Sequence, residues 1–287
     1  MILYIMSRGR AGKVNTLKWI PKEWRERTAI ICSRGEKNEY QSCNPLVVVE
    51  QAPDWVTNYS QKVQWILDGC PNAAGRTDLN DKAVILDDDL VFSAKSDPDR
   101  PNSLISITDP SQMVGNFEFI EENLNTFPLV GVHPRQMGQN AKWPFVTNGR
   151  IICIQGINRS LIGKVKVDQY PILADVVLSC TLLARGQPNA ILTTFFQDHG
   201  PCQAPGGCSI YRTPDMQRAA VDYLAARFPG YVKSVERRPK VAKWMGEVRY
   251  DYTCQWKQLY RAGVEWKEGR AASPDKEVQD VIGNVAT

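Results

Sequence analysis

The sequence VILDDDL at residues 84–90 runs from a short apolar stretch directly into three consecutive carboxylates. An apolar run of this length predicts a buried strand. Three adjacent carboxylates repel one another unless a cation neutralises them, and hard divalent cations are held by carboxylate and phosphate oxygens. The stretch therefore predicts a metal site at the end of a strand. The alternative interpretation is a solvated acidic turn.

Strands and helices alternate around this stretch. Short apolar runs at residues 2–6, 28–32 and 46–49 are typical of strands, and apolar residues at helical spacing between residues 58 and 70 predict an amphipathic helix. Repeated strand–helix–strand order predicts an α/β fold with a Rossmann-like, mostly parallel central sheet flanked by helices. In such sheets the ligand cleft lies at the carboxyl ends of the strands.

The second half of the chain is less regular. Residues 93–112, rich in Ser, Asp and Pro, predict a loop. Further strands are expected at residues 129–132, 150–154 and 190–196. Asp175 is expected to open a helix that Gly186 closes, and Thr213 to cap another that begins at Pro214.

Composition places the chain among ordinary soluble globular proteins. Of its 287 residues, 43% are hydrophobic and 23% are charged, which excludes a disordered, collagenous or coiled-coil chain. No apolar run approaches the roughly 18 residues needed to span a bilayer, and the N-terminus lacks the pattern of a signal peptide. We therefore expect a cytoplasmic protein without a membrane partner. The net charge of +4 conceals basic ends, at residues 1–37 and 233–270, and an acidic middle.

The sequence partly matches two familiar motifs, a zinc site and a phosphate-binding P-loop, but satisfies neither. The eight cysteines contain no CxxC pair, which is typical of reduced thiols in the cytosol. His199, Cys202 and Cys208 have a spacing that matches no common zinc site, and a fourth ligand is missing. The sequence GRAGKV at residues 9–14 resembles a phosphate-binding P-loop, but that motif needs Gly where Ser7 stands and Ser or Thr where Val14 stands.

The order of motifs resembles that of the GT-A nucleotide-sugar glycosyltransferases, whose Asp-x-Asp motif follows an apolar strand. The resemblance implies that Asp87 and Asp89 bind a Mn²⁺ or Mg²⁺ ion at the diphosphate of a sugar donor, with Asp88 beside them. His199 is expected as a further metal ligand, with His133 as its competitor. The resemblance also implies a set of residues that hold the nucleotide sugar: Ser7, Arg8, Arg10 and Lys62, together with the three aspartates.

In the same family an acidic residue opens a helix that ends in Gly, and Asp175 occupies that place here, although Ala174 stands where the family has Glu. The resemblance implies that Asp175 is the general base of an inverting transfer. A helix cap is the alternative role, because Asp serves well at a helix start.

Shorter motifs are similar to those of the TET-associated DNA glycosyltransferases, which include the base J glucosyltransferase of kinetoplastids and many bacteriophage enzymes. They are YIMSRGR at residues 4–10, SQK at 60–62, WIL at 65–67, residues 135–140, LLARG at 182–186, GGC at 206–208 and YRT at 211–213. The resemblance implies transfer from a UDP-sugar, such as UDP-glucose, to the hydroxymethyl group of 5-hydroxymethylcytosine or 5-hydroxymethyluracil in DNA. It also implies a GT-A domain at residues 1–235, with a nucleotide-sugar half (1–92) and an acceptor half (127–235), followed by a basic, aromatic-rich C-terminal extension at 236–287.

The acceptor side is predicted from basic residues. Lys and Arg alternate with Tyr and Trp between residues 231 and 256, a pattern suited to phosphates and unpaired bases or, alternatively, to a solvated basic surface over a core. The candidate acceptor-binding residues are His133, Arg135, Asn140, Arg150, Arg212, Arg237 and Arg238. Three alternatives stay open: a protein, glycan or small-molecule acceptor, a non-catalytic nucleic-acid-binding protein, and a nucleotidyltransferase.

Overall fold

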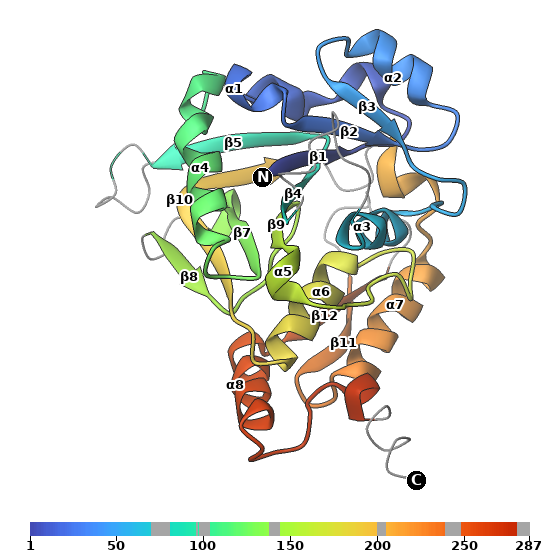
Figure 1. Cartoon of the computed structure of the whole chain (residues 1–287). Coiled ribbons are helices and arrows are strands. Elements are labelled where there is room, and N and C mark those ends of the chain that lie inside the picture. Colours follow the sequence, from blue (N-terminus) through green and yellow to red (C-terminus); the bar gives the residue numbers. More distant parts are fainter. Residues whose placement is uncertain are drawn as a thin grey trace.

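The structure is a computed structural model that describes residues 1–69, 81–95, 97, 104–137, 144–199, 205–238 and 248–279 (Figure 1). The candidate residue Asn140 lies outside the described residues. Within the described part of the chain, no helix is both long and apolar enough to cross a membrane.

The described strands build one mixed sheet in the order β3-β2-β1-β4-β9-β7-β10-β5-β6, with β8 paired to β10. Its first four strands are mutually parallel: β1 (Ile2–Met6), β2 (Thr28–Cys32), β3 (Val48–Gln51) and β4 (Lys82–Asp87). β9 (Ile154–Asn158) runs antiparallel to both β4 and β7 (Leu129–Pro134). The long strand β10 (Asn189–His199) is parallel to β7 and antiparallel to β5 (Leu90–Lys95) and β8 (Phe145–Thr147). The predicted α/β fold with a Rossmann-like parallel region is therefore confirmed, and the other half of the sheet is mixed.

Helices cover both faces of the sheet because its strands are apolar on both sides. Along β1, Ile2, Tyr4 and Met6 enter one core, and Leu3 and Ile5 enter the other. The first core is covered by α3 (Tyr59–Leu67), α6 (Ala174–Ala184) and α7 (Pro214–Arg227). The second is covered by α1 (Lys22–Arg25), α2 (Lys37–Cys43) and α4 (Val114–Asn123), which lie on the opposite side of the sheet in Figure 1. The short helix α5 (Arg159–Ile162) follows β9.

The helix predicted from apolar periodicity after Asn58 and the helix predicted from the Thr213 cap are confirmed. The Asn58 side chain accepts from the backbone N–H of Gln61 at the start of α3, and the Thr213 side chain accepts from the N–H of Met216 at the start of α7. Helix α6 begins at Ala174, so Asp175 lies in its first turn. Gly186 follows the end of α6 with a φ of 66°, a left-handed conformation that favours glycine at this position.

Two predictions of local structure are wrong. The loop predicted at residues 93–112 contains the end of β5 and the short strand β6 (Leu104–Ser106), which pair with each other. Pairing of β5 with β10 stabilises this polar segment as a strand, and a local sequence pattern does not contain that long-range partner. The strand predicted at residues 150–154 begins only at Ile154, because Cys153 has a φ of 62° that is incompatible with an extended strand.

The C-terminal residues pack against the rest of the chain. β11 (Val232–Arg237) pairs with β12 (Arg249–Cys254) in a two-stranded antiparallel sheet that lies against α7, and α8 (Trp256–Lys267) lies against α6. Tyr252 and Leu259 are buried in the same core as β1. The boundary expected at residue 235 falls inside β11.

Candidate functional site

The candidate site lies where the order of the parallel strands reverses. β1 has β2 on one side and β4 on the other, so the chain proceeds outward through β2 and β3 and then crosses back to β4. Ligands of open α/β sheets bind at the carboxyl ends of the strands at such a switch point. Met6 pairs with Asp87 in the sheet register, so the loop after β1 and the three aspartates after β4 meet at this edge.

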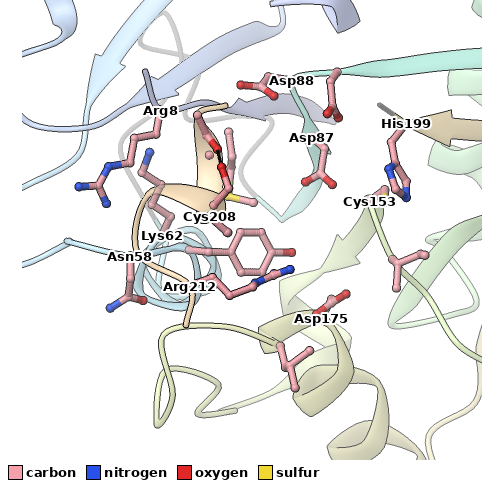
Figure 2. A pocket seen from close by; sticks show the side chains of 18 of the residues that line it. Arg8, Asn58, Lys62, Asp87, Asp88, Cys153, Asp175, His199, Cys208 and Arg212 are labelled. Carbon is pink, nitrogen blue, oxygen red and sulfur yellow. Dashed lines mark hydrogen bonds between the residues drawn. The ribbon is translucent and has the colours of Figure 1, made fainter. Parts of the chain in front are cut away.

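A cavity of about 290 Å³ opens at this edge (Figure 2). It brings together most of the predicted site residues from distant parts of the chain. The predicted residues that line it are Ser7, Arg8, Arg10, Lys62, Asp87, Asp88, Asp89, Arg150, Asp175, His199 and Arg212. In Figure 2, Asp87 and Asp175 extend into the cavity from opposite walls, and Arg212 lies beside Asp175.

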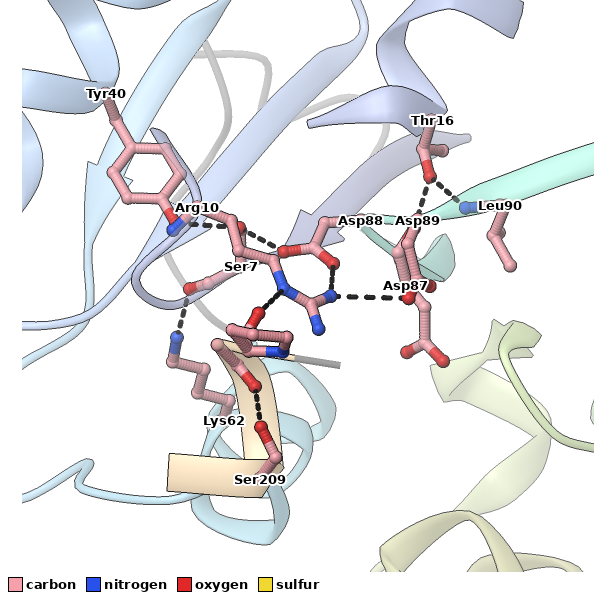
Figure 3. A network of polar contacts seen from close by, with 12 residues as sticks. Ser7, Arg10, Thr16, Tyr40, Lys62, Asp87, Asp88, Asp89, Leu90 and Ser209 are labelled. Carbon is pink, nitrogen blue, oxygen red and sulfur yellow. Dashed lines mark hydrogen bonds and ion pairs between the residues drawn. The ribbon is translucent and has the colours of Figure 1, made fainter. Parts of the chain in front are cut away.

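Asp88 anchors the loop after β1 (Figure 3). Its side chain is 4% exposed; one oxygen accepts from the Ser7 hydroxyl and the other from Arg10 Nη1, at 2.6 Å. The Ser7 Oγ also lies 2.7 Å from the Tyr40 hydroxyl. Burial raises the pKa of Asp88, and the contacts to Ser7 and Arg10 oppose that rise. Both carboxylate oxygens of Asp88 are therefore occupied by donors from the chain itself.

Arg10 is held in place by its own contacts. Besides Asp88, its Nη1 reaches Asp89 Oδ2 at 3.3 Å, and its Nε donates to the Pro205 carbonyl at 2.9 Å. Gly206 passes so close that a Cβ there would lie 2.7 Å from the Arg10 side chain. Glycine at residue 206 is thus explained by its close approach to Arg10, and Arg10 in turn holds Asp88 and Asp89 in place.

Lys62 and Arg8 support the same loop. Lys62 is 5% exposed and its Nζ donates to the backbone carbonyls of Ser7, at 2.8 Å, and Ile31, at 3.4 Å. Burial lowers the pKa of Lys62 to about 8. Arg8 donates to the Thr57 carbonyl at 2.8 Å, and its guanidinium lies 5.4 Å from the centre of the Tyr211 ring. These two side chains therefore stabilise the loop after β1, which is expected from the sequence to bind the nucleotide.

Asp87 differs from Asp88 because its carboxyl group faces the cavity. Burial, followed by the neighbouring charges of Asp89 and Asp88, raises the pKa of Asp87 to about 8, while the Cys153 thiol donates to this carboxyl group and opposes the rise. Its backbone is fixed on both sides, since Thr16 Oγ1 donates to its carbonyl at 2.5 Å and its N–H donates to the Cys153 carbonyl at 3.0 Å. A cation beside Asp87 and Asp89 would stabilise the ionised form.

The donor set suits a hard divalent cation that is shared with a ligand. Asp87 and Asp89 offer carboxylate oxygens, the ligand type that Mg²⁺ and Mn²⁺ prefer, and His199 lines the same cavity. Among the described residues, no group of three His, Cys, Asp or Glu side chains is arranged to hold a metal ion.

Asp175 lies in the first turn of α6, which begins after Leu173 in a left-handed conformation. Burial raises the pKa of Asp175, and the charge of Arg150, the backbone N–H of Val176 and the charge of Arg212 oppose that rise. The net effect is a carboxylate more basic than an ordinary Asp at a helix start. Ala174, where the family has Glu, is fully buried in the core beneath the sheet.

Several residues that line the cavity were not among the site residues predicted from the sequence, although Cys208, Arg249 and Tyr252 lie in segments that the sequence singled out. They are Tyr59, Cys153, Cys208, Gln217, Arg249, Asp251 and Tyr252. Those on β12 fall in the basic and aromatic segment predicted for the acceptor, so composition located the segment but not the side chains that face inward. The direction of Cys153 depends on its positive φ, for which the sequence holds no signal.

Four predicted acceptor residues do not line the cavity. His133 packs against Phe196, with ring centres 6.3 Å apart, and its Nδ1 lies 3.1 Å from the Pro134 carbonyl. Arg135 follows at the end of β7. Arg237 and Arg238 are exposed, and Arg237 forms an ion pair with Asp251 at 3.5 Å.

No protein-family model matches the chain, and no curated protein matches its sequence. Among solved structures, the chain is similar to a cytidylyltransferase from Leptospira borgpetersenii serovar Hardjo-bovis (strain JB197). The two are 15% identical, with a TM-score of 0.33 over 60% of this chain. The match spans 65% of the length of that protein.

Proposed function

We propose that the protein is a metal-dependent glycosyltransferase of the GT-A class. It would move a sugar from a UDP-sugar to the hydroxymethyl group of 5-hydroxymethylcytosine or 5-hydroxymethyluracil in DNA. The observation that carries this proposal is the meeting of Asp87 and Asp89, from the sheet edge, with Asp175, from the start of α6, in one cavity. Sugar transfer needs both groups: carboxylates for a cation at the diphosphate, and a separate base for the acceptor hydroxyl.

The donor would bind on the side of the cavity formed by the loop after β1 and the aspartates. Asp87 and Asp89 would hold Mn²⁺ or Mg²⁺ together with the diphosphate oxygens of the donor, and His199 is the further candidate ligand. The ion supplies positive charge to the leaving diphosphate. Arg10 and Lys62 contribute by fixing this wall, since their side chains are already bonded to Asp88 and to the Ser7 carbonyl.

Asp175 would accept the proton of the acceptor hydroxyl. Its raised pKa makes it a stronger base than an exposed Asp, and the positive charges of Arg150 and Arg212 favour the ionised form that can accept a proton. An inverting transfer uses such a base on the side of the sugar opposite the leaving group. The position of Asp175 in the first turn of α6 supports this role and is equally suited to a negative charge that stabilises the helix start.

The acceptor class rests on the resemblance and on the basic wall beside Asp175. Arg150, Arg212 and Arg249 line the cavity, and the Arg150 guanidinium lies 5.3 Å from the centre of the Tyr252 ring. Arginines neutralise phosphates, and aromatic rings stack on bases. To present a hydroxymethyl group to Asp175, DNA would have to extrude the modified base into the cavity.

The test is nucleoside mass spectrometry after incubation with Mn²⁺, a panel of UDP-sugars, and DNA with or without hydroxymethylated pyrimidines. We expect a nucleoside heavier by one sugar only from the modified DNA. Asp175→Asn should bind UDP normally and lose transfer, and Asp89→Asn should lose Mn²⁺-dependent UDP binding. Asp222→Asn is the matched control, because Asp222 is exposed on α7 and does not line the cavity.

The same assay separates the alternatives. Transfer to a protein, glycan or small molecule but not to modified DNA would keep the enzyme class and replace the acceptor. Release of pyrophosphate from a nucleoside triphosphate would indicate a nucleotidyltransferase. Tight DNA binding with no transfer from any donor would indicate a non-catalytic nucleic-acid-binding protein and would overturn the proposal.

A further inference from the structure

Three buried polar atoms lack a hydrogen-bond partner in the part of the chain that the structure describes and belong to residues that line the cavity. They are Arg212 Nε, Gln217 Oε1 and the Tyr252 hydroxyl. They come from three separate places: the segment before α7, the first turn of α7, and β12. Gln217 is 6% exposed and Tyr252 is 8% exposed, so both side chains are almost completely buried.

Such atoms are uncommon in native proteins because leaving a buried donor or acceptor unpaired is costly. Because all three belong to residues of one cavity, a molecule bound there would be in place to supply the missing partners. Arg212 Nε donates, Gln217 Oε1 accepts, and a tyrosine hydroxyl does either. The complementary ligand therefore carries both hydrogen-bond acceptors and donors, as the edge of a nucleobase does.

Arg212 and Tyr252 belong to the part of the cavity around Asp175, and Gln217 lines the same cavity. Arg212 and Tyr252 both interact electrostatically with Asp175, and α7, which carries Gln217, packs against β12, which carries Tyr252. The loop after β1 instead bonds to Asp88. Because Asp175 would take the proton of the acceptor hydroxyl, side chains grouped around it contact the acceptor rather than the nucleotide of the donor.

The aromatic ring in this group is held firmly. The Arg150 guanidinium lies 5.3 Å from the Tyr252 ring centre, and Trp256 makes an edge-on contact with the ring at 6.4 Å between centres. A fixed ring with a buried hydroxyl gives directional recognition at little cost in side-chain entropy, as expected of a preformed specificity site.

We propose that Arg212, Gln217 and Tyr252 form the acceptor-base subsite, which binds the hydrogen-bonding edge of a single pyrimidine drawn from DNA into the cavity. This inference rests on the proposed function for its choice of DNA as acceptor. It adds the residues that select the base, none of which is the proposed base Asp175 or a proposed metal ligand.

The experiment measures base-dependent binding without requiring transfer. Two fluorescent single-stranded oligonucleotides are compared, one with a single 5-hydroxymethylcytosine and the other with an abasic site at the same position. We expect the protein to bind the first at least about tenfold more tightly, the effect of one to two good hydrogen bonds at such a site. Gln217→Leu and Tyr252→Phe should each remove most of that ratio and leave Mn²⁺-dependent UDP binding unchanged.

Matched controls are Gln258→Leu and Tyr260→Phe, whose residues lie on α8 and do not line the cavity. A second readout is the urea midpoint without ligand. Replacing an unpaired buried polar group by an apolar group of similar shape should leave that midpoint unchanged or raise it. A midpoint that is unchanged or raised indicates a ligand-binding role, because loss of a structural contact would lower it.

The proposal is overturned if the unaltered protein shows no preference for the base over the abasic site. It is also overturned if Gln217→Leu and Tyr252→Phe keep the preference, weaken UDP binding instead, or lower the midpoint strongly while binding is unchanged. Failure of the proposed function has a separate signature: base-dependent binding would persist, with no sugar added from any donor.

Discussion

Asp275→Ala is expected to be among the most destabilising single substitutions in this chain. Asp275 is fully buried and forms a two-point contact with Arg227 of α7, with Nε–Oδ1 and Nη2–Oδ2 distances of 3.0 and 2.9 Å. Arg227 is 6% exposed and also donates to Thr181 of α6, at 3.1 Å. The pair therefore joins the C-terminal segment to the helix that carries Asp175.

The magnitude follows from the burial of both charges. Removing one partner of a buried ion pair leaves the other charge desolvated and unpaired, at a cost of about 3–5 kcal/mol. Arg227 keeps some compensation, because Nη1 lies 3.0 Å from both the Tyr223 hydroxyl and Glu277 Oε2, and Glu277 is partly exposed. We therefore expect a loss of about 3 kcal/mol, a large share of the 5–15 kcal/mol that stabilises a typical domain.

Urea denaturation followed by circular dichroism measures this loss, with the slope against urea checked for constancy. The double variant Arg227→Met with Asp275→Leu should recover much of the stability, because an apolar pair of similar volume carries no unpaired charge. A loss below about 1 kcal/mol for Asp275→Ala would refute the reasoning. It would show that water reaches the pair, as it does at the exposed pair of Arg34 and Asp54.

Three further predictions concern packing and protonation. Gly263→Ala should lower the free energy of unfolding by about 1–3 kcal/mol in the same urea assay, because its Cβ would lie 2.3 Å from the Leu183 carbonyl oxygen. Gly115→Ala is the control: open space surrounds that position, so the change should be neutral or stabilising. Equal effects of the two substitutions would contradict the packing argument. The pKa of Lys62 is about 8 in the folded state and ordinarily 10.5. Between pH 8 and 10.5 the unfolded state binds more protons than the folded state, so the free energy of unfolding rises with pH in this range. Lys62→Met should abolish the contribution of this residue to that rise. Asp87 has a pKa of about 8, so its carboxyl group loses its proton as pH rises through 8. Mg²⁺ should therefore raise the melting temperature more at pH 8.5 than at pH 6.5. An equal rise in the Asp87→Asn variant would place the ion elsewhere.

The sequence predicted the parallel half of the sheet and its ligand edge because both depend on local patterns. Apolar runs predicted β1, β2 and β4, apolar residues at helical spacing predicted α3, and the cap at Thr213 predicted α7. Since parallel strands end at one edge, the residues that follow β1 and β4 had to meet there. The residues that line the cavity from this edge are consequently those that the motifs predicted.

The remainder depends on contacts between distant segments. β5 and β6 form in a polar segment because β10 supplies the pairing, and β12 reaches the cavity because β11 and α7 position it. Charge patterns identified Arg237 and Arg238 as acceptor residues, but both are exposed at the end of β11, while Tyr252 of the paired strand β12 is buried in the cavity wall. Composition therefore predicts which segment approaches a site, and the fold decides which of its residues enter it.

The three aspartates have different roles because successive side chains of a strand point to opposite faces of the sheet. Along β4, Ala83 and Ile85 enter the core beneath α3 and α6, while Val84 and Leu86 enter the opposite core. Asp87 continues the first row, so it faces the side on which α6 presents Asp175, and Asp88 continues the second row toward Ser7 and Tyr40. The middle carboxylate is thereby occupied in holding the loop after β1. Asp87 and Asp89 line the cavity, and Arg10 Nη1 approaches one oxygen of Asp89 at 3.3 Å. A stretch that looks redundant as sequence thus divides into one structural carboxylate and a pair suited to a cation.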